Sequence, residues 1–131
     1  LMPQNHDGYF LYPFIYNEMC DVISASDIVL ARAGANSLWE CSVLGKPMVL
    51  IPLCGSGTRG DQVDNARFFE EKGAAIVLLG KYADSDYLKS ALEKMSDSDF
   101  RQNAAFASQS LSEGKCPAKT IAQIVWEEAV K

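Results

Sequence analysis

The chain has 131 residues, a formal net charge of -5, and 48% hydrophobic and 22% charged residues. This composition is typical of one soluble globular domain and argues against a disordered chain. No apolar run approaches the roughly 20 residues that a membrane-spanning helix needs. The sequence pI near 4.8 argues against general nucleic-acid binding, but it leaves room for a local anion site built from backbone N–H groups.

The cysteines do not have the spacing of a metal site. Cys20, Cys41, Cys54 and Cys116 form no close pair, and His6 is the single histidine. Cys20 and Cys41 lie among apolar residues at helical spacing, which predicts buried free thiols. Reduced cysteines fit a cytoplasmic location.

Short apolar runs alternate with helical patterns along the first two thirds of the chain. Strands are predicted at residues 9–14, 27–31, 48–53 and 74–79. Helices are predicted at residues 17–23, 36–44 and 61–72, around 88–95 and 100–111, and from Pro117 to about Ala129. Strands that alternate with helices imply right-handed crossovers and a parallel sheet, so the predicted fold class is α/β.

Several punctuating residues support these boundaries. Asn17 is a candidate cap for the first helix, and Gly45-Lys46-Pro47 should end the second. Gly73 is placed to end the third helix. The run at 27–31 is nearly all apolar, as expected for a strand that is covered on both faces.

The turn after the second predicted strand is a candidate anion site. It reads Arg32-Ala33-Gly34-Ala35-Asn36-Ser37 and leads directly into a helix. Gly34 can adopt dihedrals closed to other residues and lets a ligand approach the backbone. The N–H groups of Ala35, Asn36 and Ser37 would be unpaired donors at the positive end of the helix dipole, which suits a pyrophosphate. The alternative is a tight connection made of small residues.

Glu40 has two interpretations. Ser37-Leu38-Trp39-Glu40 matches the capping box, in which the glutamate bonds to a backbone N–H. Alternatively, its carboxylate accepts hydrogen bonds from two ribose hydroxyls, as an acidic residue does in dinucleotide sites.

The loop after the third predicted strand has three glycines and leads into Asp61-Gln62-Val63-Asp64-Asn65. Asp61 is a candidate helix cap. Gln62 and Asn65 are three residues apart and so share a helix face, and their amides suit sugar hydroxyls. A solvated polar face is the simpler interpretation.

The sequence shows no arrangement of residues typical of nucleophilic catalysis, and no residue is assigned as catalytic. A set of aspartates in the last part of the chain is interpreted as helix-start residues rather than as a metal cluster: Asp84, Asp86, Asp97 and Asp99.

Two motifs together point to a known family. ARAGANSLWECSVLGKPMVLIPL, followed by GTRGDQVDNARFFEEKGAAIVL, closely resembles the C-terminal, donor-binding half of the MurG family. These peptidoglycan glycosyltransferases move N-acetylglucosamine from UDP-N-acetylglucosamine to lipid I, which makes lipid II. The resemblance covers residues 9–79, and the pair of motifs is more specific than either one alone.

The resemblance implies a GT-B fold, with two Rossmann-like domains and the substrates between them. It also implies a role for each matching residue. Phe14 and Ile15 match the segment whose backbone reads uracil, and Gly34, Ala35, Asn36 and Ser37 match the turn that holds the diphosphate. Glu40 matches the ribose-binding carboxylate, and Gln62 matches the amide that recognises the N-acetylglucosamine hydroxyls. Asp61 lies beside Gln62, and Asn65 is expected to support the site from behind.

The resemblance further implies what this chain does alone. Residues 1–131 are expected to be a donor-binding C-terminal domain that lacks its first strand-loop-helix and the whole acceptor domain. No cofactor or metal is expected, because UDP-N-acetylglucosamine is the substrate. Lipid I is expected to bind the absent N-terminal domain. The full-length protein is expected to be peripheral on the inner face of the bacterial membrane, with no membrane or nucleic-acid contact through this half. The chain alone should be inactive.

Two alternatives remain open at this point. The chain could be the donor-binding subunit of a two-chain UDP-N-acetylglucosamine transferase, for which a large apolar docking face would be evidence. It could also be a non-catalytic α/β interaction module in which the RAGAN segment is only a turn.

Overall fold

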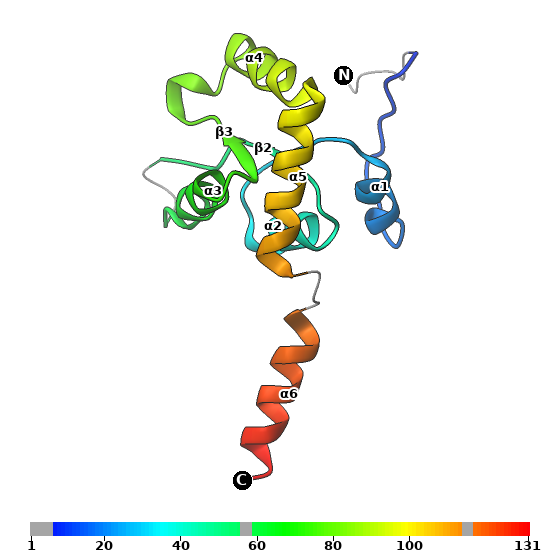
Figure 1. The fold of residues 1–131 in the computed structure, drawn as a ribbon, viewed down its shortest axis with the longest axis vertical. Coiled ribbons are helices and arrows are strands. Elements are labelled where there is room, and N and C mark those ends of the chain that lie inside the picture. Colours follow the sequence, from blue (N-terminus) through cyan, green and yellow to red (C-terminus); the bar gives the residue numbers. More distant parts are fainter. Residues whose placement is uncertain (1–6, 56–58, 114–116) are drawn as a thin grey trace.

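The computed structural model describes residues 7–55, 59–113 and 117–131. Three parallel strands form one sheet in the order β1-β2-β3, from β1 (Val29–Ala31), β2 (Met48–Leu50) and β3 (Ala75–Val77). The helices in chain order are α1 (Met19–Ala25), α2 (Ala35–Val43), α3 (Asp61–Glu71), α4 (Ser85–Ser96), α5 (Ser98–Ser112) and α6 (Pro117–Ala129), with a short 3-10 helix at Gly80–Tyr82 (Figure 1). The predicted α/β class with a parallel sheet is therefore confirmed.

The centre of the fold is β2, whose three residues Met48, Val49 and Leu50 are all fully buried. Side chains alternate between the two faces of a strand. Met48 and Leu50 accordingly join one hydrophobic cluster, and Val49 joins the other. Burying each of these side chains stabilises the fold by roughly 2 kcal/mol. The first cluster also contains Leu38 of α2 and Phe69 of α3.

The second cluster is built by the last part of the chain, which continues as helix after β3. Ala91 and Met95 of α4 and Ala104 of α5 pack there with Val49. Both helices begin as the sequence predicted. Asp84 accepts hydrogen bonds from the N–H groups of Asp86 and Tyr87, and Asp97 accepts one from Phe100. These side chains satisfy donors that a helix start otherwise leaves unpaired.

Helices α2 and α3 end in the same way. The N–H of Gly45 donates to Ser42 O at 3.0 Å and that of Lys46 donates to Cys41 O at 2.8 Å. Gly73 and Ala74 make the corresponding bonds at the end of α3. This pattern is the Schellman motif, and it needs a left-handed residue, here Gly45 at φ 62° and Gly73 at φ 78°. Both predicted helix ends are confirmed.

A buried polar contact fixes α2 against α5. The Ser42 hydroxyl donates to the backbone oxygen of Ser108 at 2.6 Å, and both serines are fully buried. Serines are small enough to let two helices approach closely. The buried face of α2 therefore lies opposite the face that carries the exposed side chains of Asn36 and Glu40.

The predicted strand at residues 9–14 is wrong. Tyr9 forms only an isolated bridge, and residues 10–16 have no regular secondary structure. Pro13 cannot donate to a strand ladder, and the side chains of this segment are mostly exposed, so it buries too little apolar surface to form a sheet strand.

Three smaller predictions are also wrong. Helix α1 is preceded by Glu18 rather than Asn17, with no side-chain cap. Strand β1 is not covered on both faces, since Leu30 is 48% exposed. Cys20 is exposed, whereas Cys41 is buried as expected. Cys116 lies outside the described residues.

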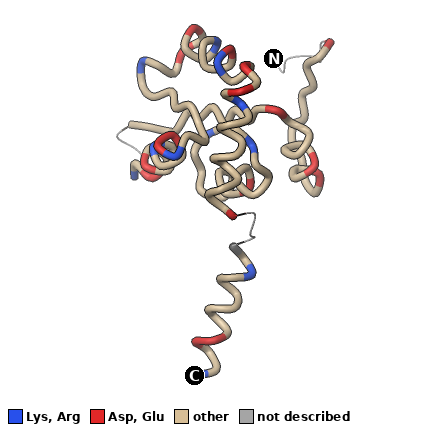
Figure 2. The backbone as a smooth tube through the Cα atoms, in the orientation of Figure 1, with Lys and Arg blue, Asp and Glu red and all other residues tan. Residues whose placement is uncertain are grey.

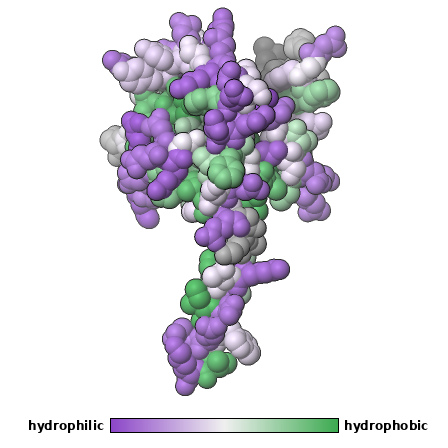
Figure 3. Space-filling model, in the orientation of Figure 1, coloured by the Kyte–Doolittle hydropathy of each residue, from purple (hydrophilic) through white to green (hydrophobic). Residues whose placement is uncertain are grey.

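Helix α6 forms from Pro117 as predicted, but its apolar face is not packed. Beyond its first turns it extends away from the body of the molecule (Figure 1). Its large hydrophobic side chains are exposed, among them Ile121, Val125 and Trp126. Figure 3 shows hydrophobic surface, coloured green, along this extended part of the molecule. Within the described residues, no helix is long and apolar enough to cross a membrane.

Charged residues of both signs are interspersed along the surface helices (Figure 2). Some pair one turn apart, as Lys89 and Glu93 do on α4 at 3.9 Å. Exposed pairs of this kind contribute little, about 0.3–0.5 kcal/mol.

The burial of Cys41 generates a prediction about thiol reactivity. Burial, and secondarily the charge of Glu40, raise the pKa of the Cys41 thiol from 9.0 to about 11, although Lys46 opposes this shift. Only the thiolate is nucleophilic, so at pH 8 Cys41 should not react with an aromatic disulfide reagent in the folded chain. Cys20 and Cys54 are exposed and should react. Peptide mass mapping after labelling measures each site. Labelling of Cys41 as fast as Cys20 would contradict the buried position, and labelling after denaturation is the control.

Candidate functional site

The site is built at the carboxyl ends of β1 and β2, where ligands bind in open parallel sheets. The two strands are in register, with Ala31 beside Leu50. The turn at residues 32–34 and the loop after Leu50 therefore leave the sheet side by side. The two segments that the sequence singled out are brought together in this way.

The turn after β1 presents unpaired backbone donors. Helix α2 begins at Ala35, and its first internal hydrogen bond runs from Leu38 N–H to Gly34 O at 3.1 Å. The N–H groups of Ala35, Asn36 and Ser37 precede that bond, so the helix itself gives them no acceptor. All three residues are exposed. With the positive end of the helix dipole behind them, these groups can bind an anion such as a diphosphate.

Gly34 has a different role from the one its sequence context predicted. Its φ is -69° and its ψ is 134°, which any residue can adopt, so the backbone does not require glycine. A Cβ built on Gly34 meets no atom within 4 Å. What glycine provides here is open space above the turn, through which a ligand can reach the N–H groups.

The capping-box interpretation of Glu40 is wrong. The N-cap of α2 is Gly34, so Ser37 lies inside the helix and cannot cap it. Glu40 is exposed, and its carboxylate has no hydrogen bond or ion pair within the described residues. It lies one turn after Asn36, so both side chains are on one face of α2. The carboxylate is thus free to accept hydrogen bonds from a ligand bound at the helix start.

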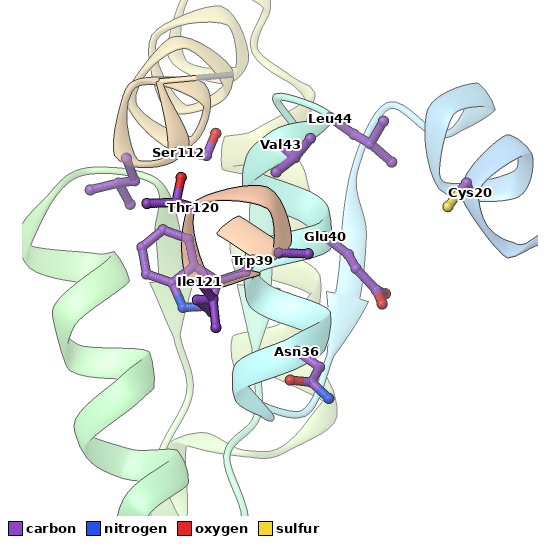
Figure 4. A pocket seen from close by; sticks show the side chains of 11 residues that line it. Cys20, Asn36, Trp39, Glu40, Val43, Leu44, Ser112, Thr120 and Ile121 are labelled. Carbon is purple, nitrogen blue, oxygen red and sulfur yellow. The ribbon is translucent and has the colours of Figure 1, made fainter. Parts of the chain in front are cut away.

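A large cavity of about 830 Å³ lies beside this face of α2. Figure 4 shows Asn36 and Glu40 on α2 with Trp39, Val43 and Leu44. Its lining is mainly apolar and includes Thr120 and Ile121 of α6. A diphosphate needs donors rather than apolar side chains, so we place the anion site at the turn and not in this cavity.

Gln62 is fixed by the loop that follows β2. Its Oε1 accepts a hydrogen bond from Leu53 N–H at 2.9 Å, and the residue is half-buried. Its amide nitrogen has no partner within the described residues. The side chain therefore offers donors to a ligand, while its oxygen holds the loop. Leu53 was not singled out by the sequence, because a backbone donor carries no side-chain signal.

Asn65 joins the two segments directly. Its Nδ2 donates to Ala33 O at 3.2 Å, across 32 positions in the chain. This bond ties α3 to Ala33, the residue just before Gly34. Asn65 therefore holds the turn in place. Asp61 is the first residue of α3 and is exposed. It does not cap the helix, since the N-cap is Gly60, at φ 81°.

Phe14 and Ile15 lie at a second, smaller cavity of about 320 Å³. Tyr12, Tyr16, Glu18 and Val22 of α1 complete its lining. Phe14 is exposed, with its ring centroid 4.4 Å from that of Tyr16, and Ile15 is half-buried. The structure does not bring these two residues into contact with the other predicted site residues.

Comparison with known proteins identifies the family. A model of the glycosyltransferase family 28 C-terminal domain matches residues 3–123. The chain belongs to this family.

Two curated relatives carry the enzyme name "UDP-N-acetylglucosamine--N-acetylmuramyl-(pentapeptide) pyrophosphoryl-undecaprenol N-acetylglucosamine transferase". The protein from Treponema denticola is 43% identical over 129 residues, which cover 94% of this chain and 33% of the relative. A Bacillus cereus protein with the same name, numbered 2, is 36% identical over 95% of this chain and 34% of its own length. The resemblance to the MurG family is confirmed. The chain spans about one third of the curated relatives' length.

A solved structure supports the fold. Spinosyn forosaminyltransferase SpnP, a GT-B glycosyltransferase, superposes with a TM-score of 0.63 at 19% identity, over 87% of this chain and 29% of its own. This glycosyltransferase family 28 C-terminal domain therefore has the fold of one part of a GT-B glycosyltransferase, as predicted. In open parallel α/β sheets, ligands bind beyond the carboxyl ends of the strands, which is where the candidate site lies.

A glycine exchange tests the turn of this family 28 domain. Gly34→Ala should change stability by less than about 1 kcal/mol, because its φ suits alanine but alanine is a poorer N-cap than glycine. It should weaken UDP binding, because the new methyl group occupies the space above the donors. Thermal unfolding and a UDP titration measure the two effects. Gly73→Ala is the matched control, because its φ of 78° is strained for alanine. It should lower stability by about 1 kcal/mol and leave UDP affinity unchanged. Unaltered UDP binding in Gly34→Ala would remove the turn from the site.

Proposed function

We propose that this chain is the donor-binding part of an enzyme that transfers N-acetylglucosamine from UDP-N-acetylglucosamine to lipid I, which forms lipid II. The observation that carries this proposal is the start of α2, where unpaired N–H groups and the free carboxylate of Glu40 share one exposed face. The name of the Treponema denticola relative, 43% identical over 94% of this chain, supports the choice of donor and acceptor.

Each part of the donor has a matching group. The N–H groups of Ala35, Asn36 and Ser37 hold the diphosphate, and Glu40 accepts hydrogen bonds from the ribose hydroxyls. The amide nitrogen of Gln62 donates to a sugar hydroxyl, since its oxygen already accepts from Leu53. Backbone groups around Ile15 and Phe14 receive the uracil. Asn65 keeps the turn in place through Ala33, and Asp61 lies beside the sugar-binding amide.

The proposed reaction inverts the anomeric carbon and needs no metal or cofactor. The C4 hydroxyl of the acceptor sugar attacks that carbon, and UDP leaves. The proton goes to a base on the acceptor domain, because no residue of this chain is assigned as catalytic. The role of this chain is to position the donor and to stabilise the charge that develops on the leaving diphosphate. We therefore expect the chain alone to bind donor without turnover.

The same proposal covers partners and location. Lipid I binds the acceptor domain, and the complete enzyme is peripheral on the cytoplasmic face of the membrane. This half contacts neither membrane nor nucleic acid. The exposed apolar face of α6 also fits the two-chain alternative, in which the acceptor domain belongs to a separate polypeptide. The donor-binding residues have the same roles in both cases.

An amide chemical-shift titration with UDP-N-acetylglucosamine, and with UDP-glucose in parallel, tests the donor site. We expect saturable shifts at Ile15, at residues 35–40 and at Gln62, with a stronger response to the N-acetyl sugar. A folded chain that shows no shifts with either donor would contradict the site.

Substitution of Glu40 tests the ribose contact. Glu40→Ala should weaken UDP binding by about 1–3 kcal/mol, the cost of losing hydrogen bonds to a charged group. Glu71→Ala, an exposed glutamate on α3, is the control and should bind UDP like the wild type. Equal affinities for Glu40→Ala and the control would exclude Glu40 from the site.

Substitution of Gln62 separates its two hydrogen-bonding roles. Gln62→Glu keeps an oxygen for Leu53 N–H but loses the amide donors, so unfolding should change little. Affinity for UDP-N-acetylglucosamine should fall about tenfold, as expected for one lost hydrogen bond of about 1–1.5 kcal/mol. Affinity for UDP, which has no sugar to bind, should fall much less, through the added negative charge alone. The control is Gln102→Glu on the exposed face of α5. If Gln62→Glu lowered the affinities for UDP-N-acetylglucosamine and for UDP by the same factor, the proposed contact between Gln62 and the sugar would be wrong.

A further inference from the structure

Lys46 makes a long-range contact that neither the motifs nor the comparisons assign. Its Nζ donates to Ser24 O at 2.7 Å and to Ser26 O at 3.0 Å. The side chain reaches across 20 to 22 positions of the chain to the end of α1. One ammonium group therefore holds two backbone oxygens of a helix that is distant in sequence.

The two oxygens lie where a helix needs a partner. The last carbonyls of any helix have no internal donor, and a positive charge there also interacts well with the helix dipole. In α1 the Ile23 oxygen is already taken by the N–H and hydroxyl of Ser26. Lys46 donates hydrogen bonds to the backbone oxygens of Ser24 and Ser26. Helix α1 has no fully buried residue, and Ile23 is its contact with the core. The ammonium contact is thus a main attachment of α1 to the rest of the fold.

The position of Lys46 itself is set by the sheet. Its N–H closes the Schellman motif of α2 on Cys41 O at 2.8 Å. The next residue, Pro47, accepts a hydrogen bond from Val29 N–H at 3.0 Å, just before β2 begins. Lys46 therefore fixes the carboxyl end of α1 relative to α2 and to the sheet.

Helix α1 in turn shapes the cavity that contains Ile15. Val22 and the N-cap residue Glu18 line this 320 Å³ cavity together with Ile15 and Phe14. Val22 lies one helical turn before Ser26, whose oxygen Lys46 holds. Because the segment 12–16 leads directly into α1, a shift of α1 would move this cavity relative to the start of α2.

We propose that Lys46 is a positioning residue for nucleobase recognition. By holding the carboxyl end of α1, it keeps the segment around Ile15 in place relative to the diphosphate-binding turn of α2. The proposal rests on the proposed function, in which that segment receives the uracil. Lys46 touches no substrate in this arrangement and acts through α1.

The test compares nucleotides that differ only in the base. Dissociation constants for UDP and ADP are measured by amide chemical-shift titration of the wild-type chain and of Lys46→Met. Lys46→Met should weaken UDP binding about fivefold, because the uracil-binding segment is then held less firmly, and should leave ADP binding nearly unchanged. The preference for UDP over ADP therefore falls. Lys46→Arg, which retains a charged donor, should restore most of it.

The controls separate positioning from general stability. Lys89→Met, on the exposed face of α4, should keep the wild-type preference. A folded Lys46→Met with an unchanged UDP to ADP ratio would overturn the proposal, and so would equal weakening of both nucleotides. If Lys46→Met does not fold, Lys46→Gln replaces it, and the ratio of its dissociation constants for UDP and ADP is compared with that of the wild type. A wild-type chain that binds no UDP would instead contradict the proposed function itself.

Discussion

The complete burial of β2 is the constraint on which the rest of this structure depends. Met48, Val49 and Leu50 are inaccessible to solvent, and their strand pairs in parallel with β1 on one side and β3 on the other. Parallel pairing places all the carboxyl ends at one edge of the sheet. The turn before α2 and the loop before α3 are consequently neighbours. This proximity allows Asn65 to reach Ala33 O, whereas Gln62 accepts from Leu53 N–H within the connection from β2 to α3.

The candidate site combines a rigid support with groups that the fold leaves free. Helix α2 is held by buried Leu38 and by the bond from Ser42 to Ser108 O, so its first residues have a fixed position. The N–H groups at that start and the carboxylate of Glu40 face solvent without partners in the described part of the chain. Fixed donors of this kind need little reorganisation when an anion binds, which is the physical basis of electrostatic preorganisation. The end of α2 also fixes the backbone of Lys46, whose side chain holds the carboxyl end of α1.

Exposed apolar side chains gather on the segments outside the sheet. Phe10, Tyr12, Phe14 and Tyr16 precede α1, and Ile121, Val125 and Trp126 lie on α6. These segments are also where prediction was least successful. Helical periodicity correctly located α6, but it could not show that the apolar face would be left unpacked. The aromatic run at 9–14 has strand-like composition, yet composition supplies no neighbouring strand, and without backbone pairing the segment stays irregular.

The sequence by itself determined the α/β class, the order of the elements from β1 to α6 and the ends of α2 and α3. Those features depend on local signals: apolar periodicity, and glycines that accept the left-handed conformation at Gly45 and Gly73. The family motifs also located the turn at residues 34–37 and the pair Gln62 and Asn65. Tertiary structure decided what these residues can do. Gly34 provides open space and does not adopt unusual dihedrals. Glu40 does not cap α2, and the side-chain oxygen of Gln62 accepts a hydrogen bond from Leu53 N–H. Tertiary structure also joined Lys46 to the carbonyls of α1. Such contacts link residues far apart in the chain, often through backbone atoms, and backbone atoms are the same at every position of a sequence.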